Sequence, residues 1–282
     1  MIWKTRSRIL DLSHSAKIIG ILNVTPDSFS DGGQFYSLQA ALSHARELIA
    51  EGAEIIDVGG ESTRPGADPV PLKEELRRII PVIEKIRSEF PSALVSVDTY
   101  KATTAREAIR AGADIINDVT ALRGDPGMID VLLESGAGVV LMHMQGQPKT
   151  MQVAPSYQDV VSEVMAFLKD RRDWLADRGV DRESIAIDPG FGFGKRLADN
   201  IKLVRNLDAF RALAQPLLIG VSRKSGLAQL AGDSALPASE RVWPTVALTC
   251  LLREKGAHLL RVHDVKPNLE ALRMTEAILE RC

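Results

Sequence analysis

Four polar residues in this sequence could together read the edge of a flat, nitrogen-rich ring. Asp98, Asn117 and Asp188 each end a short apolar run, and Lys224 follows another. These residues offer carboxylate acceptors, an amide that both donates and accepts, and a cation. Because a carboxylate can accept two parallel N–H bonds, the set suits a heterocycle that carries amino and keto groups.

A second set of residues favours anions. Arg64 and Arg261 each present a fork of donors that matches phosphate oxygens. His263 lies two residues beyond Arg261 in the segment LLRVH, and the period of two in a strand puts both side chains on one side. Together with Asn23, these residues predict a site for a phosphate-like group beside the ring.

Each of these residues also has a simpler structural interpretation. An Asp or Asn beyond a strand often caps the next helix, and Asp57, Asp98 and Asn117 all fit that role. A single histidine is more often structural than catalytic. The functional interpretation requires that the side chains meet at one end of the fold.

The segment DPGFGFGK, residues 188–195, has the composition of a phosphate-binding loop but the wrong spacing. A P-loop requires glycine where Pro189 stands and Ser or Thr where Arg196 stands. A dinucleotide-binding fingerprint requires glycine in place of Lys195. The glycines instead indicate a turn whose backbone lies close to a pocket.

A repeated phrase predicts the fold. GAEIID, GADIIN, GAGVVL and GAHLLR each read as a helix ended by glycine and followed by a buried strand. Their spacing predicts four further strands, at residues 17–23, 93–98, 184–188 and 216–222. Eight strands that alternate with helical segments predict an α/β fold of the (β/α)8 TIM barrel type, with an open doubly wound sheet as the alternative.

In a barrel, chemistry belongs to the C-terminal ends of the strands, where the polar residues above all stand. Two long loops on that face, NVTPDSFSDGGQF and GGESTRPGADPVPL, are expected to handle substrate. Nothing divides the chain, so residues 1–282 are expected to form one domain whose core starts at about residue 17. Pro81 and Pro244 fall inside predicted helices, which we expect them to kink or break.

Composition narrows the class of partner. A hydrophobic fraction of 45% and a charged fraction of 26% are typical of a globular protein, and a net charge of -2 lacks the basic field that nucleic acid binding requires. No signal peptide is predicted, and no apolar run reaches the ~18 residues that span a bilayer. Two cysteines give no disulfide framework, so we expect a cytoplasmic protein with small-molecule substrates.

Eight motifs, taken in order, resemble the dihydropteroate synthase family. They extend from about Lys17 to the last predicted strand and are NVTPDSFSDGG, GGESTRPGA, VSVDT, INDV, MHMQGQPKTMQ, DPGFGFGK, SRKS and RVHDV. The resemblance implies a folate-pathway transferase that joins 4-aminobenzoate to 6-hydroxymethyl-7,8-dihydropterin diphosphate, giving 7,8-dihydropteroate and diphosphate. It also implies a homodimer formed through helices near the C-terminus.

The resemblance assigns roles to the matching residues. The residues that bind the pterin are Asp98, Asn117, Asp188 and Lys224. The residues that handle the diphosphate and Mg²⁺ are Asn23, Arg64, Arg261 and His263, with Asp57 and Thr63 nearby and Asn23 as the metal ligand. The aminobenzoate site comprises Phe29, Thr63, Pro65 and Ser225, beside Lys224. The catalytic residues are Lys224, Arg261 and His263, because charge that develops as the diphosphate leaves needs stabilisation and no side-chain nucleophile is required.

Two other functions stay open at this level. A methyltetrahydrofolate-binding corrinoid methyltransferase domain shares the barrel and the ring contacts, but a methyl donor has no diphosphate for Arg261 and His263 to bind. A non-catalytic pterin-binding paralogue should lose loop or last-strand residues that this chain retains.

Two positions depart from the family pattern. Gly226 stands where a bulky apolar residue is expected, which predicts looser packing beneath Lys224. The pair Trp243 and Pro244 is also unusual. Both concern the aminobenzoate rim and the helix near it, and neither affects the pterin residues.

Overall fold

A computed structural model describes residues 1–25, 34–62, 66–147 and 149–279, and its centre is a parallel eight-stranded sheet. The spatial order of the strands follows the chain, and the last of them returns to the first. A parallel bridge between Ile187 and Leu217 joins the two edges of the sheet. The strands are β3 (Lys17–Asn23), β4 (Ile55–Gly59), β5 (Leu94–Asp98), β6 (Ile115–Asp118), β7 (Gly138–Met142), β8 (Ile185–Asp188), β9 (Leu218–Ile219) and β10 (Leu259–Val262). The predicted barrel is confirmed.

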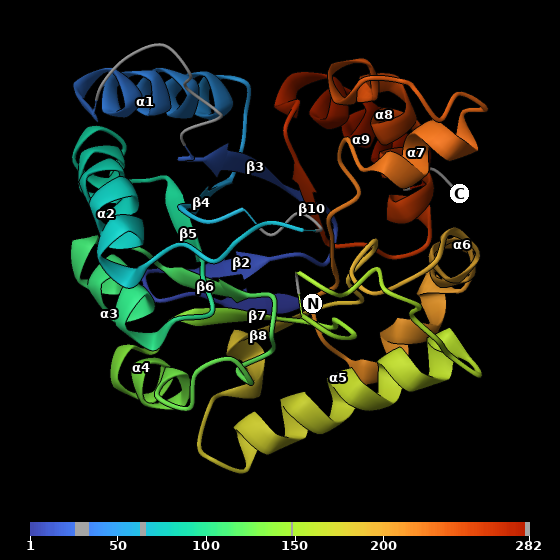
Figure 1. The fold of residues 1–282 in the computed structure, drawn as a ribbon, viewed down its shortest axis with the longest axis horizontal. Coiled ribbons are helices and arrows are strands. Elements are labelled where there is room, and N and C mark those ends of the chain that lie inside the picture. Colours follow the sequence, from blue (N-terminus) through green and yellow to red (C-terminus); the bar gives the residue numbers. More distant parts are fainter. Residues whose placement is uncertain (26–33, 63–65, 148, 280–282) are drawn as a thin grey trace.

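Helices surround these strands, as Figure 1 shows. They are α1 (Gln34–Ala50), α2 (Leu72–Glu89), α3 (Ala102–Ala111), α4 (Met128–Ser135), α5 (Val160–Ala176), α6 (Leu197–Arg205), α7 (Ser225–Leu230), α8 (Val242–Glu254) and α9 (Val265–Leu279). Gly112 and Gly136 cap α3 and α4 in the left-handed conformation, as the repeated phrase predicted. Within the described residues, no helix is both long and apolar enough to cross a membrane.

The strands alternate between two cores, which decides where their polar ends point. Ile55 and Leu94 belong to a cluster inside the barrel, whereas Ile56 and Val95 belong to the larger cluster that includes residues of the helices. Because side chains alternate along a strand, residues two and four positions beyond an interior residue also face inward. The barrel interior is therefore apolar toward the N-terminal ends of the strands and polar at their C-terminal ends, which form the mouth of the barrel.

Neither proline breaks its helix. Helix α2 continues through Pro81 from Leu72 to Glu89, so the predicted break is wrong there. Pro244 lies in the first turn of α8, which begins at Val242. Proline is tolerated in a first turn because the N–H it lacks would have no partner within the helix.

A hairpin that the sequence pattern did not predict plugs the other end of the barrel. Strands β1 (Ile2–Lys4) and β2 (Ile9–Asp11) pair antiparallel. Trp3 is fully buried in the interior cluster, and its indole N–H donates to the Ser184 carbonyl at 2.9 Å, just before β8. The hairpin therefore closes the N-terminal end and leaves the C-terminal mouth for chemistry.

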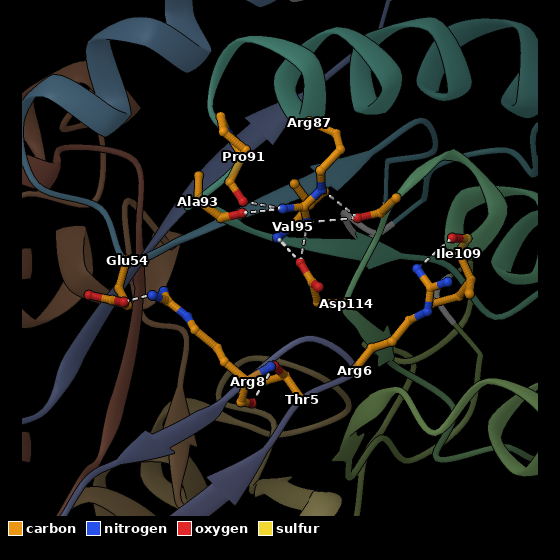
Figure 2. Close-up of polar contacts among 11 residues, drawn as sticks. Thr5, Arg6, Arg8, Glu54, Arg87, Pro91, Ala93, Val95, Ile109 and Asp114 are labelled. Carbon is orange, nitrogen blue, oxygen red and sulfur yellow. Dashed lines mark hydrogen bonds and ion pairs between the residues drawn. The ribbon is translucent and has the colours of Figure 1, made fainter.

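Hydrogen bonds and ion pairs of three arginines stabilise this closed end, as Figure 2 shows. Arg6 of the hairpin donates to the Ile109 carbonyl at 3.1 Å, and Arg8 pairs with Glu54. Arg87 of α2 pairs with the buried Asp114, which also accepts the Val95 N–H at 3.0 Å. These contacts tie the hairpin and α2 to the segments that enter the strands.

Replacing the plug residue is expected to destabilise the barrel. Trp3→Ala removes a fully buried indole and should lower the free energy of unfolding by about 3–5 kcal/mol. Urea unfolding followed by circular dichroism measures this free energy of unfolding. Ile9→Ala, at a position 59% exposed on the same hairpin, is the control and should change little. A Trp3→Ala protein as stable as this control would contradict the plug.

Candidate active site

Strand register places one predicted diphosphate residue and two predicted ring-binding residues in a row at the mouth. Asn23 of β3 lies opposite Gly59 of β4, which lies opposite Asp98 of β5, and Asp98 lies opposite Asn117 of β6. Each is two residues beyond a position on the same inward face, for example Asn117 after the interior residue Ile115. Asp98 and Asn117 are buried and Asn23 is half-buried.

Arg261 connects the carboxylates of this row. Its Nε donates to Asp57 Oδ2 at 2.6 Å, and its Nη2 donates to Asp98 Oδ2 at 2.8 Å. Asn117 Nδ2 donates to the same Asp57 oxygen at 3.1 Å. One guanidinium therefore serves two buried carboxylates, and the side chains of four strands form a single network.

This arrangement perturbs the ionisation of Asp98. Burial raises the pKa of its carboxyl to about 7, since a charged carboxylate loses hydration there. Arg261 opposes the rise, while the nearby Asp57 carboxylate adds to it. A carboxyl with a pKa near neutrality is poised either to accept from a ring N–H or to hold a proton.

Asp188 and Lys224 lie at the opposite side of the mouth and are joined through the glycine-rich loop. Asp188 Oδ1 accepts the Gly190 N–H at 2.7 Å, and burial raises the pKa of this carboxyl. Lys224 Nζ donates to the Phe191 carbonyl and lies 4.5 Å from the centre of the Phe193 ring. Loss of solvation lowers the pKa of the Lys224 ammonium to about 7.

His263 follows Arg261 on the same face, just beyond the end of β10. Its Nδ1 lies 3.0 Å from Ser222 Oγ, and its backbone N–H donates to the same oxygen at 3.1 Å. Ser222 is buried, so it fixes the ring orientation. The predicted pair thus stands at the mouth, with His263 oriented by Ser222 and Arg261 held by Asp57 and Asp98.

The cap interpretation of the carboxylates is wrong for α3. The residue that precedes this helix is Lys101, with no side-chain cap hydrogen bond, so Asp98 does not cap it. Asp57 accepts hydrogen bonds from both Asn117 and Arg261 across the barrel. These side chains therefore serve the mouth of the barrel and not the helices that follow.

Several predicted residues lie outside the part of the chain that the structure describes. Phe29, Thr63, Arg64 and Pro65 are in this group. Ser225 is described, and it is the exposed first residue of α7, next to Lys224. The structure therefore brings together the predicted pterin residues and three of the four predicted diphosphate residues, and it gives no information on the remaining one or on most of the aminobenzoate site.

Sequence reasoning missed a charged network beside the mouth. Lys101 Nζ donates to Glu61 Oε2 and Glu75 Oε2, both at 2.6 Å, and to the Val70 carbonyl at 2.7 Å. Thr99 Oγ1 donates to Glu75 at 2.7 Å. This network anchors the segments on both sides of residues 63–65 to the end of β5. The one signal in the sequence was a lysine at a helix N-cap, where Ser, Thr, Asp or Asn is preferred.

A magnesium ion at this mouth would have few protein ligands. Within the described ranges, no cluster of three or more His, Cys, Asp or Glu side chains could hold a metal ion. A Cβ built on Gly59 would lie 3.9 Å from Asn23 Oδ1 and 3.8 Å from Asp98 Oδ2, so these oxygens flank bare backbone. Mg²⁺ often takes one or two protein oxygens together with substrate phosphates, and Asn23 fits that donor set.

Gly226 leaves space next to the glycine-rich loop. A Cβ built on it would lie 3.5 Å from Leu197 Cδ1 and 3.8 Å from Phe191 Cε1, which are ordinary contact distances. Room for a methyl group therefore exists beside the Phe191 ring.

Comparisons with known proteins agree on one family. The profile of the pterin binding enzyme family matches residues 19–263. Dihydropteroate synthase of Escherichia coli (strain K12) is 49% identical over 270 residues, which cover 96% of this chain and 94% of that one. Two solved structures of the Xanthomonas albilineans dihydropteroate synthase are also similar. The one with 4-aminobenzoic acid is 45% identical with a TM-score of 0.91 and covers 99% of this chain and 98% of that one. The one with 7,8-dihydropteroate is 42% identical with a TM-score of 0.88 and covers 99% of each.

The perturbed carboxyl predicts a specific pH dependence of stability. Since the pKa of Asp98 is raised in the folded state, its contribution to stability is present below about pH 4 and is lost as the pH rises to about 7. Asp98→Asn lacks this titration, so the difference in free energy of unfolding, wild type minus variant, should fall between these pH values. Urea unfolding at several pH values measures the difference, and a constant value would show that Asp98 titrates normally.

Proposed function

This chain belongs to the dihydropteroate synthase family, and on that premise we propose how its barrel mouth performs the reaction. The enzyme is a transferase that condenses 6-hydroxymethyl-7,8-dihydropterin diphosphate with 4-aminobenzoate to give 7,8-dihydropteroate and diphosphate. The observation that carries the assignment of roles is the network in which Arg261 joins Asp57 and Asp98. It puts a cation for the diphosphate directly beside a carboxyl for the ring.

The pterin ring is read by Asp98, Asn117, Asp188 and Lys224. Asp98 and Asn117 come from adjacent strands and are neighbours in register, so they can bond the same edge of a flat ring. Asp188 and Lys224 face the ring from the other side of the mouth, where Phe193 lies against the ammonium. The buried carboxyls accept ring N–H bonds in a site from which water is largely displaced, which strengthens each bond.

The diphosphate is bound by Asn23, Arg64, Arg261 and His263. Arg261 has two donors engaged by Asp57 and Asp98, and its fork geometry allows it to turn a donor toward an incoming phosphate oxygen. His263 is oriented by Ser222. Asn23 would hold Mg²⁺, which when bound neutralises charge on the leaving diphosphate.

The reaction proceeds by departure and then attack. The C–O bond between the pterin methylene and the diphosphate breaks, its electron pair leaves with the diphosphate, and the electron-rich ring shares the positive charge left on carbon. Arg261 and His263 stabilise the departing anion, while the Asp98 and Asp188 carboxylates favour the cationic ring. The lone pair of the aminobenzoate amine then forms the C–N bond, and the amine loses one proton.

The second substrate enters from the loop side of the mouth. Lys224 and Ser225 are consecutive at the start of α7, so the aminobenzoate site adjoins the pterin site. Phe29, Thr63 and Pro65 are assigned to its outer wall on the basis of the family motifs. The anchoring of Glu61 and Val70 by Lys101 supports this assignment because it holds both flanks of the Thr63 segment near β5.

The decisive test is synthesis followed by mass spectrometry. Purified protein with the pterin diphosphate, Mg²⁺ and 4-aminobenzoate should form 7,8-dihydropteroate, and folded protein that forms none would refute the proposal and favour a non-catalytic paralogue. In the same preparation, Asp188→Asn should weaken pterin binding by about 1–3 kcal/mol because a charged acceptor of two bonds is lost. Calorimetry measures the affinity, with the exposed Asp208→Asn as the matched control.

We further propose that the enzyme is a homodimer that acts in the cytoplasm. Exposed apolar side chains lie along α8 and α9, which pack against each other: Trp243 (72% exposed) is in the first turn of α8, and Met274 (65%) and Ile278 (60%) are in the last two turns of α9. A patch of this kind is typical of a subunit interface. Two copies joined through it would leave each barrel mouth complete.

The dimer is checked by sedimentation. The protein should sediment as a dimer at micromolar concentration, and Trp243→Asp, which places a charge in the patch, should shift it toward the monomer. Val153→Asp is the control, at an apolar residue 77% exposed elsewhere on the surface. A wild-type protein that sediments as a monomer would rule the interface out.

A further inference from the structure

The glycine-rich loop positions both polar groups on one side of the mouth. Asp188 stands at its start and accepts the Gly190 N–H, and the Phe191 carbonyl receives the Lys224 ammonium. Gly190, Gly192 and Gly194 all have positive φ, and no regular helix or strand fixes this segment. A loop with this much backbone freedom needs side-chain contacts to hold one conformation.

Lys195 provides such contacts from inside the protein. Its side chain is only 2% exposed, and its ammonium donates to the carbonyls of Gly190 at 2.9 Å and Phe193 at 3.0 Å. It also lies 2.9 Å from Nδ1 of His143, in the segment after β7, and 3.3 Å from the His143 carbonyl. The three N–H groups of the Lys195 ammonium therefore face four acceptors, two in the loop after β7 and two in the loop after β8.

The protonation states agree with this geometry. Burial and the neighbouring Lys195 cation lower the pKa of the His143 imidazole to about 3, so the ring is neutral and its Nδ1 can accept. No carboxylate in the described ranges contacts the Lys195 ammonium, and burial lowers the pKa of the ammonium to about 7. The more distant Asp188 and Asp199 carboxylates only partly oppose this effect. A buried cation that no carboxylate contacts costs stability, and so its contacts are better explained by positioning than by stabilisation.

The two loops also touch backbone to backbone. A Cβ on Gly190 would clash with the His143 carbonyl, and a Cβ on Gly194 would clash with the Gln145 carbonyl. Because backbone atoms of the two loops are in direct contact, a shift of the loop after β7 also moves the glycine-rich loop. Lys195 is the polar group that joins the two at this contact.

We propose that Lys195 is a positioning residue for pterin recognition, which ties the loop after β7 to the loop after β8 and thereby fixes Asp188 and Lys224. The inference rests on the proposed function, because it assumes that these two residues read the ring. Lys195 itself contacts loop carbonyls and His143, so it acts through its neighbours.

The test replaces the ammonium and keeps the length of the side chain. Lys195→Met should raise the dissociation constant of the pterin diphosphate, measured by calorimetry with Mg²⁺, about tenfold at unchanged stoichiometry. KM for the pterin diphosphate should rise to a similar extent, while KM for 4-aminobenzoate should change less than about twofold. Lys202→Met, at an exposed lysine of the neighbouring α6, is the matched control and should bind as the wild type does.

The binding stoichiometry distinguishes a positioning role of Lys195 from a role in stability alone. If Lys195 only stabilises the fold, the stoichiometry falls with the folded fraction while the remaining protein binds with the wild-type dissociation constant, and the inference is overturned. If Lys195→Met does not fold, His143→Phe decides, since it removes one acceptor and keeps the edge-on packing of the ring against Phe167. That variant should weaken pterin binding several-fold, and unchanged binding would overturn the inference. Failure of the wild-type protein to bind the pterin diphosphate would instead refute the proposed function.

Discussion

The mouth of the barrel depends on one half-buried guanidinium placed between two buried carboxylates. Arg261 bonds Asp57 and Asp98 across strands that are distant in sequence, and Asn117 completes the network. Removing one partner of such a buried pair typically costs about 3–5 kcal/mol, because the other charge is left without compensation. The same contacts that hold the strand ends together therefore prepare the site, since the cation and the perturbed carboxyl are the groups that a pterin diphosphate requires.

The two ends of the barrel have different roles: the N-terminal end is packed with apolar side chains, and the C-terminal end carries the polar network. Trp3 and the interior residues of the strands fill the lower part, so the N-terminal end contributes packing. The polar groups are confined to the mouth because each strand reaches it with an inward-facing position left for a charged or amide side chain. Stability and chemistry are thus served by different layers of the same strands.

Around the mouth, lysines buried to different degrees organise the loops. Lys101 joins Glu61 and Glu75, and so connects the segment after β4 to the end of β5. Lys195 joins the loops after β7 and β8. Lys224 lies between them and the proposed ring site. The long loop after β4 and the loops after β7 and β8 are consequently attached to the barrel by specific hydrogen bonds.

The sequence by itself determined the barrel and the identity of most of the polar residues at its mouth. Short buried apolar runs and glycine-ended helices are local features of the sequence, so strands such as Lys17–Asn23 and Leu94–Asp98 were predicted within one residue. Ordered motifs then gave the family. The three-residue strands of the N-terminal hairpin are too short for periodicity to reveal, and their pairing with the barrel interior is a long-range contact.

Only the tertiary structure decided how the charged residues pair. Arg261 is 204 residues from Asp57 and 163 residues from Asp98, so no local pattern could show that one guanidinium serves both carboxylates before any substrate arrives. In the sequence, Lys195 stood out only as the residue that departs from the dinucleotide-binding fingerprint. Its burial among carbonyls of two loops arises from the parallel order of β7 and β8 and from glycines that let the backbones touch. Such contacts depend on packing between distant segments, which spacing along the chain does not encode.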